Sequence, residues 1–349
     1  MTKIIKLDKN NPDIKLIEEA AKVLREGGLV AFPTETVYGL GANSLNEDAV
    51  KKIFIAKGRP QDNPLILHIA EFEDLHRYVK EIPYKAVILM KKFWPGPLTM
   101  IFEKSDIVPY INTAGTNTVA LRMPSNRIAH LLIKHAGVPI SAPSANLSGK
   151  PSPTEVSHVI HDLNGKVDVI IDGGRCDVGV ESTVLDMTEE IPIILRPGSI
   201  TKEMIEKVIG EVKVDLAVSE ESSGDLKAKA PGMKYKHYSP NAEIYIVKGN
   251  LENVIKKIQE LTEIQLNNGK KVGIMATEQT SPQYCKGYVI VVGDRNNPET
   301  IAKNLFDVLR EFDNQGIDIV YSEGFSCDEI GLAVMNRLEK AAGYKEILV

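Results

Sequence analysis

Four cationic side chains stand where predicted helices or strands end in the first part of the chain: Lys57, Arg59, Arg122 and Arg196. Lys57 and Arg59 flank a glycine directly after a predicted helix, and Arg196 precedes a Pro-Gly pair. Because α/β sheets bind ligands at strand ends, these cations favour an anionic ligand such as a phosphate or a carboxylate. Alternatively, Lys57 and Arg59 are solvent-exposed cations at a helix C-terminus, where the helix dipole favours positive charge.

The stretch 141–154, with the sequence SAPSANLSGKPSPT, is rich in small hydroxyl residues held between prolines. It follows the apolar run 137–140, so a buried strand breaks here into a loop of hydroxyl donors and backbone amides, which suits a phosphate. A Ser/Pro-rich surface turn is the alternative. Together with the cations, these hydroxyls favour phosphoryl or nucleotidyl transfer, in which positioning and charge neutralisation dominate.

Other types of site find little support in the sequence. His68 and Arg122 lie within predicted strands; a buried arginine needs an anionic partner, whereas a lone strand histidine is more often a hydrogen-bonded core residue. There is no G-x-S-x-G motif, and the histidines and cysteines do not cluster. We therefore expect no metal ligands from protein side chains, and Mg²⁺ would be carried by substrate phosphates.

Strands and helices alternate without repeats up to about residue 210, which indicates an α/β domain. The helices are expected at about 13–26, 46–56, 72–80, 83–92, 126–136, 154–162 and 201–209. The strands are expected at 29–32, 65–69, 98–103, 118–124, 167–172, 180–186 and 191–195. Because its polarity alternates, 180–186 is predicted to be an edge strand.

Residues 211–240 change from acidic and serine-rich to basic and lack the periodicity of a core element, which predicts a linker. From 241 to 349 the pattern is that of βαβ units, with strands at 243–247, 271–276, 288–292 and 317–321 and helices at 251–267, 298–315 and 329–342. This predicts a small doubly wound domain. It lacks the G-x-G-x-x-G and P-loop motifs, so the sequence assigns it no ligand.

The composition is that of a soluble globular protein of 349 residues, 43% hydrophobic and 26% charged. Its 42 basic and 47 acidic residues give a net charge of −5, so no global field attracts nucleic acid. Three scattered cysteines favour a reducing compartment. The N-terminus lacks the apolar core of a signal peptide, and no apolar run approaches about 18 residues. We expect a cytoplasmic protein without a membrane segment.

The motifs taken together resemble one family. They are PTETVYGL at 33–40, KGRP at 57–60, NPL at 63–65, SAPSAN at 141–146 and ESTV at 181–184. This set is similar to the YrdC-type threonylcarbamoyl-AMP synthases in their long form. The resemblance implies a YrdC-like twisted open mixed sheet with helices in 1–210, a linker in 211–240 that acts as a lid, and a smaller Rossmann-like doubly wound domain in 241–349.

The resemblance also implies an activity: L-threonine, bicarbonate and ATP would give threonylcarbamoyl-AMP and pyrophosphate. A separate transferase would use this product to form threonylcarbamoyladenosine at position 37 of tRNA. The implied catalytic set is Lys57, Arg59, Ser144 and Asn146. The implied threonine set is Thr34, Thr36, His68, Arg122, Ser144 and Ser182. The implied ATP set is Arg59, Asn63, Thr118, Ala142, Ser152, Arg196, Tyr235, His237 and Tyr238.

On this basis we hypothesise that the threonine amine is carboxylated first and that the carbamate then attacks the α-phosphate. Lys57 and Arg59 would neutralise the developing charge. Two rival functions remain open: weak RNA binding by the cations, against which the net charge counts, and a carbamoyl transferase of the hydrogenase-maturation kind, which would need more zinc-finger cysteines. The second domain could also be only a structural clamp.

Overall fold

The structure is a computed structural model that describes residues 1–215 and 237–349. The described residues fall into two compact units. Met1–Ser148 and the residues from Ser152 to 215 form the first unit, and Gly149–Pro151 and the residues from 237 onward form the second. Each unit has its own sheet and its own hydrophobic core, so each is described by itself.

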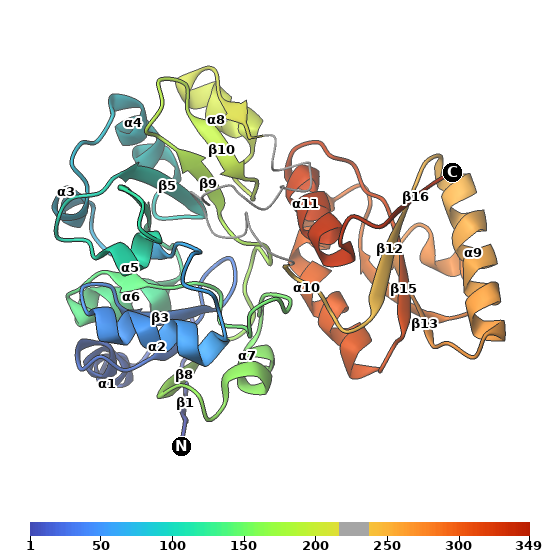
Figure 1. Ribbon diagram of the computed structural model, residues 1–349, viewed down its shortest axis with the longest axis horizontal. Helices are drawn as coiled ribbons and strands as arrows, with labels where there is room; N and C mark the ends of the chain where they lie inside the picture. The colour runs from blue at the N-terminus through green and yellow to red at the C-terminus, as the bar shows by residue number, and fades with distance from the viewer. Residues whose placement is uncertain (216–236) are drawn as a thin grey trace. The chain divides into compact units, whose positions relative to one another are not determined.

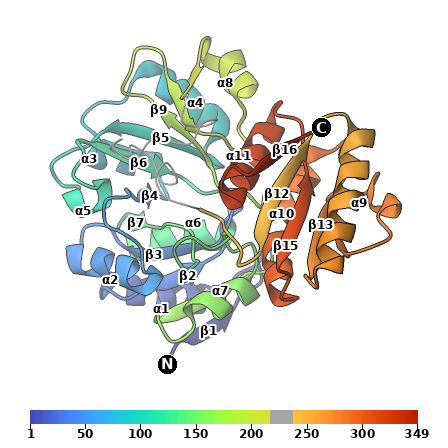
Figure 2. The ribbon, with the colours of Figure 1, turned by 45° about the vertical axis from the view of Figure 1, so that its right-hand side comes forward.

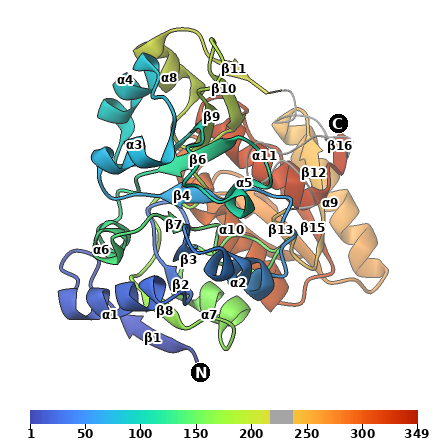
Figure 3. The same ribbon diagram turned by 60° about the vertical axis from the view of Figure 1, so that its left-hand side comes forward.

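The first unit is built on a twisted mixed sheet whose strands follow in the order β1-β8-β2-β3-β7-β4-β6-β5-β9-β10-β11 (Figure 3). The strands are β1 Lys3–Lys6, β2 Val30–Phe32, β3 Gly39–Asn43, β4 Ile66–His68, β5 Leu98–Glu103, β6 Thr118–Arg122, β7 Ile140–Ser141, β8 Val169–Asp172, β9 Thr183–Asp186, β10 Ile193–Arg196 and β11 Lys213–Val214. β4 and β6 run parallel, whereas β7 runs antiparallel to both β3 and β4. The central strands β2, β3, β7 and β4 are short, with two to five residues each.

Two helices of the first unit, those at Glu47–Lys57 and Arg127–Ala136, begin and end at residues that satisfy free backbone groups. Asn46 and Asn126 accept hydrogen bonds from the first turns of α2 and α6, and Gly58 and Gly137 end the same helices in the left-handed conformation. The helices are α1 Ile14–Arg25, α2 Glu47–Lys57, α3 Leu75–Tyr78, α4 Tyr84–Phe93, α5 Tyr110–Thr113, α6 Arg127–Ala136, α7 Val156–Leu163 and α8 Lys202–Ile209, with a 3₁₀ turn, η1, at Phe72–Asp74.

Three of the apolar clusters of the first unit join its helices to the sheet. α1 and α6 pack together over β2 and β8, with Leu24 and Leu132 fully buried. α2 and α7 enclose a second cluster around Tyr38 and Ile53. The third cluster joins α4 and α8 around β5 and β6 and includes Trp94, the single tryptophan. These helices hold the ends of the central strands in fixed positions.

The second unit has five parallel strands in the order β14-β13-β15-β12-β16. They are β12 Glu243–Lys248, β13 Val272–Thr277, β14 Tyr288–Gly293, β15 Ile319–Glu323 and β16 Glu346–Leu348. The helices are α9 Leu251–Asn267, α10 Pro298–Asn314 and α11 Ile330–Ala342, and Ser281–Gln283 forms a 3₁₀ turn, η3. Figures 1 and 2 show α9 on one face of this sheet and α10 and α11 on the other, so the predicted doubly wound fold is confirmed.

The prediction of an edge strand at 180–186 is wrong. Only Thr183–Asp186 forms a strand, and β9 lies between β5 and β10 with all four residues buried. Its polar residues tolerate burial because they are hydrogen-bonded: Thr183 Oγ1 donates to Ile200 O at 2.6 Å, and Asp186 Oδ1 accepts from the amide and hydroxyl of Thr188. Alternating polarity therefore did not mean alternating exposure here.

Several elements were not predicted. Within the predicted linker 211–240, Lys213–Val214 forms the short edge strand β11 beside β10. The short elements β1, β3, α5 and β16 were also missed. In the part of the chain that the structure describes, none of the helices combines the length and the apolar character needed to cross a bilayer.

Candidate active site

Lys57 ends α2 and lies next to the loop that follows β7. We call this loop, residues 142–154, the serine-rich loop. The Lys57 side chain is buried, and Nζ donates hydrogen bonds to the backbone carbonyls of Ser144 and Asn146. The amide of Ser148 donates in turn to the carbonyl of Lys57 at 2.9 Å. The lysine thus fixes the course of the loop. It also brings a positive charge to Ser144 and Asn146, the residues with which the motifs had grouped it.

The serine-rich loop is also fixed from its other side, by the start of β3. The amide of Leu40 donates to Pro143 O and the amide of Ala145 donates to Tyr38 O, both at 2.8 Å. Ala142 N reaches Ile66 O of β4 at 3.0 Å. These hydrogen bonds tie the loop to both β3 and β4.

Arg59 follows the left-handed Gly58 and turns toward the segment that enters β4. Its Nη2 donates to the carbonyls of Asn63 at 3.3 Å and Pro64 at 3.1 Å. Asn63 is 1% exposed, and its Oδ1 has no hydrogen-bond partner among the described residues. An amide oxygen in this position calls for a donor, because an unsatisfied buried acceptor is costly.

Arg122 and His68 occupy paired positions at the ends of the parallel strands β6 and β4. Arg122 Nη2 lies 2.7 Å from a carboxylate oxygen of Glu35, and both side chains are buried. Its Nε donates to Gly96 O at 3.3 Å. Burial, and secondarily the charge of Arg122, lowers the pKa of His68 to about 3, so this imidazole is neutral near pH 7.

Two threonines of the segment between β2 and β3 flank Glu35. The hydroxyls of Thr34 and Thr36 are 2.8 Å apart, and that of Thr34 also donates to Val37 O at 2.6 Å. Beside them, burial raises the pKa of the Cys176 thiol. Gly179 N donates to Thr36 O at 3.1 Å, which ties this segment to the chain that leads to Ser182.

Ser182 is fully buried between two partners. Its hydroxyl lies 2.8 Å from Thr99 Oγ1, and Arg196 donates to both its carbonyl and its hydroxyl at 3.1 Å. The Gly96–Pro97 segment contacts both Arg122, through Gly96 O, and Thr183, through Pro97 O. The structure therefore brings Ser182 and Arg196 into the same region as Arg122.

The remaining predicted residues are placed as follows. Ser152 Oγ donates to the buried Glu181 at 2.5 Å, and the hydroxyls of Thr118 and Thr116 are 3.2 Å apart. Tyr235 lies outside the described residues. His237 and Tyr238 belong to the second unit, where the Tyr238 ring packs against Phe306 with ring centroids 5.1 Å apart. Their role toward a nucleotide stays a prediction.

Three polar residues of this region were not among the predicted site residues: Glu35, Thr99 and Glu181. Glu35 and Glu181 lie within the motifs at 33–40 and 181–184, so an acidic residue beside threonine or serine was the available signal. Thr99 carried a weaker signal, as a lone hydroxyl in an apolar strand. Among the described residues, no group of three or more His, Cys, Asp or Glu could hold a metal ion.

Comparison with known proteins identifies the family. Residues 22–198 match the Sua5, YciO and YrdC family model, described as "Telomere recombination", and residues 200–343 match "Threonylcarbamoyl-AMP synthase, C-terminal domain". A threonylcarbamoyl-AMP synthase of Pyrococcus abyssi is 54% identical over 95% of this chain and 96% of its own length. The chain belongs to the threonylcarbamoyl-AMP synthase family. A family member from Bacillus subtilis is 50% identical over 98% of this chain and 96% of its own.

Solved structures of the family agree with this assignment. The crystal structure of P. abyssi Sua5 complexed with L-threonine matches all of both chains with a TM-score of 0.95 at 52% identity. Escherichia coli YciO matches 57% of this chain and 96% of its own with a TM-score of 0.52 at 28% identity. The predicted resemblance to the long, two-domain form is therefore confirmed.

Proposed function

We propose that this protein synthesises threonylcarbamoyl-AMP and pyrophosphate from L-threonine, bicarbonate and ATP. The reaction makes it a nucleotidyltransferase. The observation that carries the proposal is the buried Arg122, which lies opposite His68 and pairs with Glu35, in a chain 52% identical to a protein solved with L-threonine. A cation that can bind a carboxylate, together with the hydroxyls of Thr34, Thr36 and Ser182, is the chemistry that a polar amino acid requires.

In this proposal, L-threonine binds in the region around Arg122. The Arg122 guanidinium can hold the threonine carboxylate in a two-pronged contact. Thr36 and Ser182 supply hydroxyls for the amine or the side-chain hydroxyl, and neutral His68 adds a partner without adding charge. The threonine amine would attack the carbon of bicarbonate, and loss of water would leave a carbamate.

The phosphates of ATP would bind to the cations next to the serine-rich loop. The carbamate oxygen would attack the α-phosphorus in line, a new P–O bond would form, and pyrophosphate would leave. Lys57 and Arg59 would neutralise the charge that builds up on the phosphate oxygens. Ser144 and Asn146, held by Lys57, would position the reacting groups. Mg²⁺ would arrive bound to the phosphates of ATP.

The nucleotide would lie along residues at the edge of this region. We assign its contacts to Arg59, Asn63, Thr118, Ala142, Ser152 and Arg196, with Tyr235, His237 and Tyr238 closing over it. The unpartnered Oδ1 of Asn63 supports this assignment, because it can accept a hydrogen bond from a nucleotide amino group. The product would pass to a separate transferase that modifies tRNA in the cytoplasm.

The direct test is pyrophosphate release from ATP, measured with and without L-threonine and bicarbonate, with the nucleotide product identified by its mass. We expect release that needs both co-substrates and a product with the mass of threonylcarbamoyl-AMP. Substitution of Lys57 or Arg59 by alanine should lower kcat by about 100-fold or more, because each removes a charge that stabilises the transition state.

Lys51→Ala is the matched control, since Lys51 is exposed on the same helix as Lys57 and pairs with Asp48. It should retain wild-type turnover. Pyrophosphate release that is indifferent to threonine, or near-normal turnover in Lys57→Ala, would contradict the proposal. Salt-sensitive RNA binding without ATP turnover would instead support the RNA-binding function.

A further inference from the structure

Glu35 is a buried carboxylate beside Arg122, in the region that we assign to threonine. It is 6% exposed, and its carboxylate forms an ion pair with Arg122. No other donor among the described residues reaches either carboxylate oxygen. Burying such a pair costs desolvation energy that the attraction barely repays, and apolar residues of similar volume are often as stabilising. The pair therefore points to a chemical role for Glu35.

Threonine would change the partners of both side chains. Its carboxylate competes with Glu35 for the Arg122 guanidinium, whose Nε is already engaged with Gly96 O. Its ammonium supplies the positive charge that Glu35 then needs. Because an unpaired buried carboxylate is strongly disfavoured, Glu35 would pair with the ammonium once the substrate carboxylate takes Arg122.

The reaction needs a group that removes a proton from that ammonium, since only the neutral amine has the lone pair that attacks bicarbonate. His68 is a poorer acceptor, because burial and the neighbouring Arg122 cation both disfavour its protonated form and lower its pKa to about 3. The other ionisable groups around Glu35 are Arg122, a cation, the Cys176 thiol and Asp177, whose amide donates to the Glu35 carbonyl at 3.1 Å. Burial raises the pKa of Cys176, which keeps the thiol protonated.

We propose that Glu35 is the proton acceptor that converts the bound threonine ammonium into the attacking amine. The proposal rests on the proposed function. The ammonium gives one proton to the Glu35 carboxylate, and the nitrogen forms a bond to the carbon of bicarbonate. A C–O bond then breaks and one water leaves. Ammonium, bicarbonate and carboxylate thus become carbamate, water and carboxylic acid, with the charge balanced.

The test compares the wild type with Glu35→Gln and Glu35→Asp. Glutamine keeps the volume of the side chain but cannot take the proton. We expect kcat of Glu35→Gln at pH 7 to fall by on the order of 100-fold, and then to rise about tenfold per pH unit up to pH 9, because the solvent must supply the free amine. The wild type and Glu35→Asp should show a flat profile over this range.

Threonine binding, measured by calorimetry, separates this role from a structural one. In Glu35→Gln the affinity for threonine should stay within threefold of wild type, because the lost ion pair with the ammonium is offset by the removal of the carboxylate that competes for Arg122. Asp186→Asn is the matched control: it alters a buried carboxylate of the same unit that bonds Thr188, and kcat should keep the wild-type dependence on pH.

Three results would overturn the proposal. One is a kcat for Glu35→Gln within threefold of wild type at pH 7. Another is a loss of turnover that is equal at every pH and parallels a loss of threonine binding, since this is what disturbance of Arg122 alone would produce. If the wild-type protein makes no threonylcarbamoyl-AMP, the proposed function fails and this role fails with it.

Discussion

At the scale of single residues, His68 makes the stability of the first unit depend on pH. Burial lowers the pKa of its imidazole from 6.5 to about 3, so the folded protein keeps the ring neutral while the unfolded chain binds a proton below pH 6.5. The stabilisation is complete above pH 6.5 and is lost as the pH falls toward 3. Between pH 6.5 and 5 the wild type should lose about 2 kcal/mol of unfolding free energy through this group.

His68→Gln should remove that part of the pH dependence, whatever its effect on stability at neutral pH. The measurement is urea unfolding at several pH values, followed through the fluorescence of Trp94. His76→Gln is the control because His76 is exposed, and its curve should keep the wild-type slope. If His68→Gln and the wild type lose stability in parallel between pH 6.5 and 5, the imidazole is not held neutral.

The sequence pointed to the kinds of side chain in the candidate site, cations and hydroxyls, but not to the residues with which they pair. The clustered cations and hydroxyls pointed to an anionic ligand, and the structure does place Lys57 under the serine-rich loop. The pairing of Glu35 with Arg122 could not be predicted in this way. The two residues are 87 positions apart in the sequence, and only the order of β2, β3, β7, β4 and β6 in the sheet brings their segments together.

At the scale of elements, the position of the serine-rich loop depends on how closely β3 approaches its neighbours. A Cβ atom on Gly41 would lie 2.8 Å from the Phe32 ring and 2.9 Å from Ile140 Cγ2, and both side chains are fully buried. Gly41→Ala should therefore push β3 away from β2 and β7 and cost about 1 to 3 kcal/mol of unfolding free energy. Turnover should fall, because the loop after β7 moves with that strand.

Gly39→Ala on the same strand is the matched comparison. Its added Cβ would meet the Ala142 Cβ at 3.3 Å, a contact that a small shift relieves, so its loss of stability should be clearly smaller. Chemical denaturation and pyrophosphate release measure the two effects. Equal losses in the two variants would mean that the packing of β3 against Phe32 and Ile140 does not position the loop.

Long periodic elements could be predicted closely from the sequence, and short strands such as β2 and β4 could be placed along the chain, but the order of the short strands in the sheet could not be predicted. The predicted helix at 251–267 is confirmed to the residue, because seventeen residues give a clear amphipathic pattern. β7 has two residues and lies between β3 and β4. The apolar run at 137–140 predicted a buried strand here, but the position of β7 in the sheet follows from partners that are distant in the sequence.

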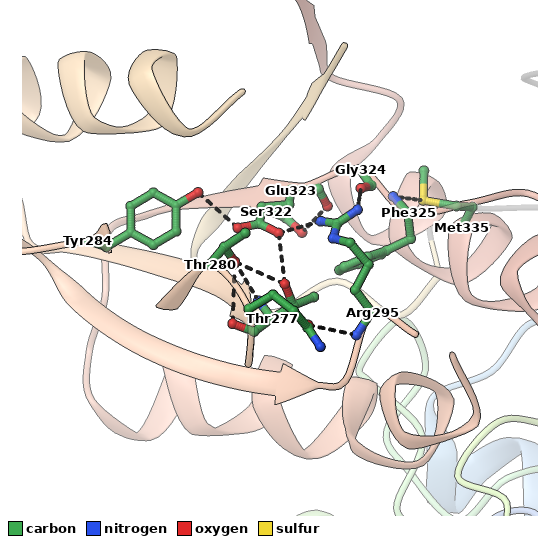
Figure 4. Close-up of polar contacts among 10 residues, drawn as sticks. Thr277, Thr280, Tyr284, Arg295, Ser322, Glu323, Gly324, Phe325 and Met335 are labelled. Atoms are coloured by element: carbon green, nitrogen blue, oxygen red, sulfur yellow. Dashed lines mark hydrogen bonds and ion pairs between the residues drawn. The ribbon is translucent and has the colours of Figure 1, made fainter. Parts of the chain in front are cut away.

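At the scale of the whole molecule, the two units have separate hydrophobic cores. A substitution in a polar cluster at the end of the second sheet should therefore destabilise the second unit without changing the stability of the first. Figure 4 shows Glu323, at the end of β15, receiving hydrogen bonds from Tyr284 at 2.9 Å and Thr277 at 3.4 Å and pairing with Arg295. Burial, and secondarily this carboxylate, raises the pKa of Tyr284, which keeps its hydroxyl a donor. Arg295 also donates to Gly324 O at 3.2 Å.

Glu323→Ala should destabilise the second unit by about 2 to 4 kcal/mol, because it leaves three polar side chains without their shared acceptor. Amide exchange of β13 and β15, followed by mass spectrometry, should report this loss. The fluorescence of Trp94, which lies in the first core, should show an unchanged urea midpoint. Glu278→Ala removes an exposed carboxylate of the second unit and should alter neither readout. If Glu323→Ala moved the fluorescence midpoint as far as the exchange, the two cores would unfold as one cooperative body.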